Sequence, residues 1–103
     1  MEQNPIPPDQ CADLDQIRAG MDWIDREIVA LIARRVAYVR AAAKFKASSA
    51  GVAAPERVAA VLKTRRAWAE AAGLSGEVVA SLYRELVAYC VSEEHKQWES
   101  DRR

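Results

Sequence analysis

Residues 33–47 read ARRVAYVRAAAKFKA, and they contain an arginine where the pattern of an amphipathic helix requires an apolar residue. On both sides of it, apolar residues recur in alternating steps of three and four, the spacing of one helix face. The members of this apolar series are Leu14, Ile17, Met21, Ile24, Ile28, Leu31, Tyr38, Ala42 and Phe45. The step after Leu31 falls on Arg35. A guanidinium in an apolar seam is costly unless it is paired or faces a ligand, so Arg35 is predicted to have a function.

The same series predicts one very long first helix. Asp13 is the expected N-cap, and the helix runs from Leu14 to about Lys46. About 33 residues at roughly 1.5 Å each make a rod of about 50 Å, whereas a domain of 100 residues has a radius of gyration of about 13 Å. A single chain would leave the apolar seam of such a rod in water. An intertwined homodimer is therefore favoured over a break near Gly20 or Arg34 that folds the rod back.

Two further helices are expected after this rod, so the predicted fold class is all-α. The segment 47–55, ASSAGVAAP, interrupts the pattern. Pro55 suits the first turn of a second helix that stops at Gly73, and Ser75 can cap a third helix that reaches about Trp98. The predicted organisation is a disordered lead-in at 1–12, one helical domain at 13–99 and a polar tail at 100–103.

Composition excludes several functional classes. The 103 residues carry 15 basic and 15 acidic side chains, a balance that argues against a dedicated binder of nucleic acid or anionic membranes. No apolar run approaches the roughly 18–20 residues that span a bilayer, and no signal pattern is present, so a cytoplasmic location is expected. Cys11 and Cys90 are too few for a disulfide framework and are predicted to be reduced thiols.

Three cations of the first helix lie on one side of it. At roughly 100° per residue, Arg18, Arg35 and Lys46 fall within a sector of about 100°. Arg35 and Lys46 are roughly 16 Å apart along the axis, so their side chains can converge on one small ligand. Arg18 is too distant for the same ligand but could complete the site of an antiparallel partner chain. This set suits a small dicarboxylate, because arginine binds carboxylates bidentately. Other basic residues of this helix are predicted to be solvated: Arg34, Arg40 and Lys44.

The last helix contains the opposite anomaly. Its apolar face is marked by Val79, Tyr83, Leu86, Val87 and Cys90. The next residue on that face is Glu94. A carboxyl in this position is either the ion-pair partner of a buried cation or a site residue that carries a proton. Its neighbour Glu93 is predicted to point elsewhere.

These residues together resemble a known family, the all-helical chorismate mutases, and most closely its branch of isochorismate-pyruvate lyases that form salicylate. The likeness extends from Leu14 to Trp98, and in the lyase branch it is nearest at FKAS, APERVAAVL and EEHKQW. The positions that carry it are Leu14-x-x-Ile17-Arg18, Asp22-x-x-Asp25, Arg34-Arg35, Lys46, Pro55-Glu56-Arg57 and Glu94.

The resemblance implies an intertwined dimer with two equivalent sites and a pericyclic reaction that needs no cofactor and no metal. By position, Arg35 and the partner's Arg18 would bind the two carboxylates of chorismate or isochorismate. Lys46 would donate to the ether oxygen of the breaking C–O bond, from a segment that can order over the ligand. Arg57 would help to organise the site. Glu94 takes the place of a glutamine that also contacts the ether oxygen in many members.

Two departures bear on the choice between mutase and lyase. Typical mutases have an aspartate before the PxR turn and a glutamate after it, and the glutamate contacts the ring hydroxyl of chorismate. This chain has Ala54 and Val58 there, as in the lyase branch. Loss of a polar contact weakens selection of a hydroxylated substrate. Because lyases of the family keep some mutase activity, both reactions remain open.

Two other classes of protein remain as alternatives. One is a non-catalytic helical dimerisation module in which Arg35 and Glu94 are merely paired in the core. The other is a nucleic-acid binder that uses the basic residues between positions 34 and 46. The second alternative needs a one-sided basic stripe, whereas Arg35 and Arg40 face different sides of the helix.

Overall fold

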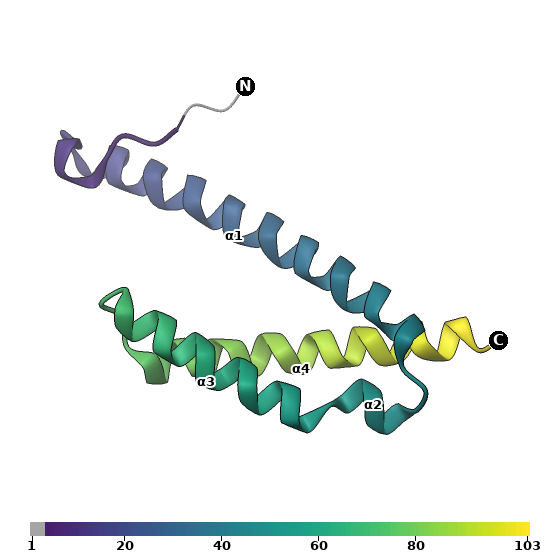
Figure 1. The fold of residues 1–103 in the computed structure, drawn as a ribbon. Helices are drawn as coiled ribbons and strands as arrows, with labels where there is room; N and C mark the ends of the chain where they lie inside the picture. The colour runs from purple at the N-terminus through teal and green to yellow at the C-terminus, as the bar shows by residue number, and fades with distance from the viewer. Residues whose placement is uncertain (1–3) are drawn as a thin grey trace. The chain divides into compact units, whose positions relative to one another are not determined.

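The computed structural model describes residues 4–103, and every regular element in that range is helical (Figure 1). The predicted all-α class is therefore confirmed. The chain divides into two compact units, one ending at Arg35 and the other comprising Val36–Arg103. The elements in chain order are η1 (Pro8–Gln10), α1 (Leu14–Ala42), η2 (Ala43–Phe45), α2 (Ser49–Ala53), α3 (Pro55–Ala71) and α4 (Gly76–Asp101).

The start of α1 is held by two reciprocal hydrogen bonds. The backbone N–H of Gln16 donates to Oδ1 of Asp13 at 2.8 Å, which confirms Asp13 as the N-cap. The Gln16 side chain in turn accepts from the backbone N–H of Ala12, the residue before the cap, at 2.7 Å. Before this cap, Pro8–Gln10 forms a turn of 3-10 helix within the predicted lead-in, while residues 1–3 of that lead-in lie outside the described range.

Helix α1 is 29 residues long, or roughly 43 Å. It ends at Ala42 and not at about Lys46, because the backbone tightens into η2 over Ala43–Phe45. Ala43 is only 1% exposed, and η2 contacts α4, so packing decides this change. Ile17 is partly buried, whereas the other large apolar residues of the series before Arg35 are each about half exposed in the single chain: Leu14, Met21, Ile24, Ile28 and Leu31.

In the second unit, α3 and α4 form an antiparallel pair with α2 and η2 beside α4 (Figure 1). Gly73 stands in the connection between α3 and α4 with a φ of 80°, a conformation that glycine adopts without strain. The N–H of Leu74 donates to the carbonyl of Ala69 at 2.8 Å, closing a Schellman turn. Ser75 then caps α4 by accepting from the N–H of Val78. The predicted stop at Gly73 and the cap at Ser75 are confirmed.

The segment predicted to break the pattern contains a short helix of its own. Ser48 caps α2 by accepting from the N–H of Gly51 at 3.2 Å. The helix ends at Ala53, and its C-cap Ala54 has a left-handed backbone with a φ of 39° directly before Pro55. Pro55 is the first residue of α3, as its sequence position predicts. The last helix extends to Asp101, beyond the expected end at about Trp98, and the predicted domain limits at 13 and 99 stay predictions.

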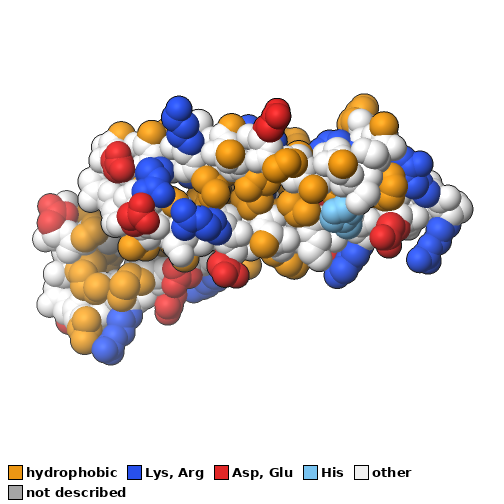
Figure 2. Space-filling view, turned by 90° about the horizontal axis from the view of Figure 1, so that it is seen from below, with side chains coloured by type: hydrophobic (Ala, Val, Ile, Leu, Met, Phe, Trp, Pro, Cys, Tyr) orange, Lys and Arg blue, Asp and Glu red, His pale blue; other side chains and the backbone are white. Residues whose placement is uncertain are grey.

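The core of the second unit consists of small and medium side chains. Its buried apolar members are Val36, Ala43, Val52, Val61, Ala69, Ala80, Val87 and Cys90. Larger apolar side chains remain at the surface, where they lie between charged ones (Figure 2). These include Tyr38, Phe45, Trp68, Leu82 and Tyr89, each more than half exposed. None of the helices within residues 4–103 is both long and apolar enough to cross a membrane.

Candidate active site

Lys46 and Glu94, two of the five predicted site residues, are in contact. The Nζ atom of Lys46 donates to the carbonyl of Gly51 at 3.1 Å and lies 3.5 Å from Oε2 of Glu94. Their side chains are 28% and 8% exposed, respectively. An ion pair so largely removed from water is held by electrostatics that solvent screens only weakly. This pair is the centre of the candidate site, although the catalytic roles of both residues stay predictions.

Two different elements bring this pair together. Lys46 follows η2 with an extended backbone, and its N–H donates to the carbonyl of Ala43 at 3.1 Å. Glu94 comes from the C-terminal half of α4, on the predicted apolar face that it shares with the buried Val87 and Cys90. Glu94 is the only charged residue that is buried among residues 4–103. Its position on an apolar face therefore did indicate an unusual environment.

The two predicted arginines of α1 lie in the first unit. Arg18 is exposed, and Arg35 is partly buried. The expectation that Arg35 and Lys46 converge on one ligand stays a prediction, because these residues belong to different units. Arg57 lies in the first turn of α3, two residues after Pro55, and is exposed.

A second ion pair, between Arg40 and Glu93, lies next to Glu94 and was not predicted from the sequence. Arg40, predicted to be solvated, is 2.5 Å from Oε1 of Glu93, and Lys96 is 3.0 Å from Oε2 of the same carboxylate. The Glu93 side chain is only 12% exposed. The hydrogen bond from Arg40, followed by that from Lys96, holds the pKa of Glu93 below its ordinary value. Only the pair of Glu93 and Lys96 can be recognised from the sequence, because residues three apart are neighbours on a helix surface.

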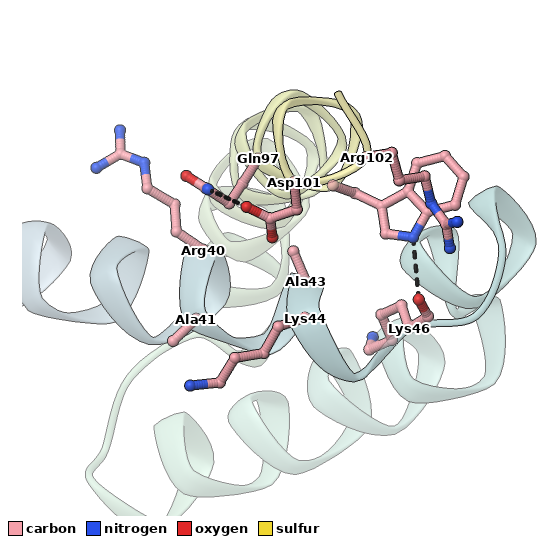
Figure 3. A pocket seen from close by; sticks show the side chains of 9 residues that line it. Arg40, Ala41, Ala43, Lys44, Lys46, Gln97, Asp101 and Arg102 are labelled. Carbon is pink, nitrogen blue, oxygen red and sulfur yellow. Dashed lines mark hydrogen bonds between the residues drawn. The ribbon is translucent and has the colours of Figure 1, made fainter.

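A cavity of about 760 Å³ lies beside Lys46, near the end of α4 (Figure 3). Its wall includes Arg40, Lys44, Gln97 and Asp101 in addition to Lys46. Glu94 does not line this cavity. A substrate bound in the cavity would therefore not contact both Lys46 and Glu94. Within residues 4–103, no group of three or more His, Cys, Asp or Glu side chains is arranged to hold a metal ion.

Comparison with known proteins identifies the class of protein that these features define. The chorismate mutase type II family matches residues 17–95, which include all five predicted site residues. The chain therefore belongs to the chorismate mutase type II family. The predicted family is confirmed, and with it the prediction of an enzyme.

Two curated relatives are similar over most of the chain. The isochorismate pyruvate lyase of Pseudomonas aeruginosa is 43% identical over 95 residues, which are 92% of this chain and 94% of that protein. The T-protein of Haemophilus influenzae is 32% identical over 84 residues, which are 81% of this chain. Of the T-protein's own length, the aligned part is only 22%.

Proposed function

We propose that this chain cleaves isochorismate to salicylate and pyruvate, and that it also rearranges chorismate to prephenate at the same site. The observation that carries the proposal is the largely buried pair of Lys46 and Glu94, within a chain that resembles a named isochorismate pyruvate lyase along its length. Ala54 and Val58 favour the lyase as the main activity, because they replace two carboxylates expected in a typical mutase. Membership of the chorismate mutase type II family favours the second activity.

Lys46 can stabilise the charge that develops on the ether oxygen. An ammonium group has three N–H donors, and two of them are directed at the carbonyl of Gly51 and at Oε2 of Glu94. The third is available to the ether oxygen of a bound substrate. Because the ammonium group lies in a site of low water content, its effect on the transition state is greater than it would be in water.

Glu94 contributes a hydrogen bond when it carries a proton. An ionised carboxylate is acceptor-only and would repel a dianionic substrate, whereas a protonated carboxyl donates as a glutamine amide does. The salicylate and pyruvate products together contain all atoms of isochorismate, so the cleavage requires no co-reactant. What the protein must provide is a compact conformer of the substrate and charge stabilisation at one oxygen.

A homodimer completes the site in this proposal. The exposed apolar series of α1 gives a second copy an apolar surface to cover. In an antiparallel arrangement, the partner's Arg18 would join Arg35 in binding the two carboxylates, with Arg57 organising the site from α3. Guanidinium groups suit these carboxylates because they bind them in a bidentate manner.

The proposal is tested with purified protein and the two substrates supplied separately. Release of salicylate and pyruvate from isochorismate, followed by absorbance and by a coupled pyruvate assay, is the expected main activity. Formation of prephenate from chorismate is expected at a lower kcat/KM. Conversion of neither substrate would contradict the proposal and would favour the dimerisation module. Lys46→Ala protein is the control that separates catalysis by this site from contamination.

A further inference from the structure

Two side chains at the end of α4 hold the backbone of Lys46 and its neighbour. The indole Nε1 of Trp98 donates to the carbonyl of Lys46 at 3.0 Å, the dashed line that ends on Lys46 in Figure 3. Nη2 of Arg102 donates to the next carbonyl, that of Ala47, also at 3.0 Å. The guanidinium carbon of Arg102 lies 4.0 Å from the centroid of the Trp98 ring, a cation–π contact that joins the two donors. We name Trp98 and Arg102 the C-terminal clamp.

The clamp shares one face of the last helix with Glu94. Glu94, Trp98 and Arg102 follow one another in steps of four, which places them one above the other along a helix. All three contact the same short segment. Glu94 contacts the ammonium group of Lys46, while the clamp binds the carbonyls of residues 46 and 47. One helix therefore sets both the backbone of Lys46 and the partner of its side chain.

The segment that the clamp holds lies between two helical elements. Lys46 has an extended backbone, with a φ of −101° and a ψ of 128°, and α2 begins only at Ser49. Ala47 is exposed. A segment outside the regular hydrogen bonding of a helix opens easily unless other contacts restrain it. Side-chain donors from α4 provide that restraint at two consecutive carbonyls.

We propose that the C-terminal clamp positions the Lys46 ammonium group for catalysis. The inference rests on the proposed function, in which Lys46 acts on the ether oxygen. Trp98 and Arg102 are positioning residues, since they bind the backbone at residues 46 and 47 and act on the reaction through Lys46. A small displacement of a catalytic group lowers the rate of the chemical step more than it weakens binding.

Three variants test the clamp. Trp98→Phe removes the indole N–H and keeps an aromatic ring against Arg102. Arg102→Ala removes the second donor and the cation above the ring. Arg103→Ala is the matched control, because it removes the same charge from the neighbouring exposed position.

The kinetic test separates kcat from KM on isochorismate. We expect kcat to fall about three- to tenfold in Trp98→Phe, the range for one lost hydrogen bond, and about two- to fourfold in Arg102→Ala. KM should change less than kcat in both, and Arg103→Ala should match the wild type. In a Lys46→Ala background, Trp98→Phe should cause no further loss, because the ammonium group that it positions is absent.

Hydrogen–deuterium exchange provides a readout that does not depend on activity. Amides of residues 46–53 should exchange faster in both clamp variants than in Arg103→Ala, with α3 unchanged. The proposal would be overturned if hydrogen–deuterium exchange of residues 46–53 were unchanged, or if kcat of the clamp variants equalled that of Arg103→Ala. It would also be overturned if Trp98→Phe lowered kcat as much in the Lys46→Ala background as in the wild type. If Trp98→Phe does not fold, Arg102→Ala is judged by the same criteria. A wild type inactive on both substrates would instead overturn the proposed function.

Discussion

The Nζ atom of Lys46 lies 3.5 Å from Oε2 of Glu94, a residue 48 positions further along the chain. The contact places a cation and a carboxyl group in a region from which most water is excluded. Lys46 also donates to the carbonyl of Gly51 at 3.1 Å. In the proposed reaction, a dianionic substrate with its ether oxygen beside Lys46 would compete with Glu94 for the ammonium group.

Removal of the Lys46 ammonium group should affect the chemical step. In Lys46→Ala we expect kcat to fall by a factor on the order of 10² to 10³, as when one donor of an oxyanion hole is removed. KM should change little, because the lost interaction is strongest in the transition state. Steady-state kinetics on isochorismate provide the measurement. A rise in KM at constant kcat would show that Lys46 binds a carboxylate instead.

Replacement of Glu94 by glutamine should change how activity depends on pH. Only a protonated carboxyl can donate a hydrogen bond, whereas a glutamine amide donates at every pH. Glu94→Gln keeps a donor at every pH, and its profile should therefore be flat, with higher activity than the wild type at neutral to alkaline pH. The measurement is kcat/KM between about pH 5 and 9.

A different result would contradict a hydrogen-bond-donating role for Glu94. A glutamine variant that is less active than the wild type at every pH would make Glu94 a structural partner of Lys46. Glu99→Gln, an exposed change of the same kind on α4, is the control for a general effect of lost charge.

The two arginines of α1 should complement each other between chains. Arg18→Ala and Arg35→Ala homodimers should both be nearly inactive, since each lacks one carboxylate-binding guanidinium in every site. A heterodimer made by mixing and refolding contains one intact site. A statistical mixture of twofold-symmetric dimers should then recover about a quarter of wild-type activity. Heterodimers that form, as shown by mass spectrometry, but recover no activity would exclude a borrowed Arg18.

The ion pair of Arg40 and Glu93 should make the free energy of unfolding depend on pH. The hydrogen bonds from Arg40 and Lys96 hold the pKa of Glu93 below its ordinary value of 4.5 in the folded chain. A lowered pKa contributes stability that is present above about pH 4.5 and is lost as the pH falls through the folded value. The difference in free energy of unfolding between the wild type and Glu93→Gln should therefore shrink between pH 6 and pH 3.

Urea unfolding at matched protein concentration measures this difference, since association of chains would otherwise shift the apparent stability. Glu99→Gln again serves as control, because Glu99 is exposed on the same helix. A constant difference across the pH range would show that the contact between Arg40 and Glu93 does not contribute to stability in solution.

The sequence by itself determined the features whose cause lies within a few residues. Asp13 and Ser75 cap helices because each side chain accepts from an N–H three residues later. Gly73 ends α3 because its left-handed backbone is unstrained without a Cβ atom. The apolar series of α1 and the position of Glu94 could likewise be recognised, since helical periodicity alone places a residue on a face.

Only the tertiary structure decided what these faces contact. Lys46 meets Glu94, Arg40 meets Glu93, and Trp98 meets the Lys46 carbonyl across separations of 48, 53 and 52 residues. No local pattern encodes such pairs, because they depend on the packing of η2 against the last helix. The same packing, with Ala43 almost fully buried, ended α1 early although apolar periodicity continues. Periodicity shows which residues share one face of a helix. A site also depends on the distances between residues of different elements, which periodicity does not contain.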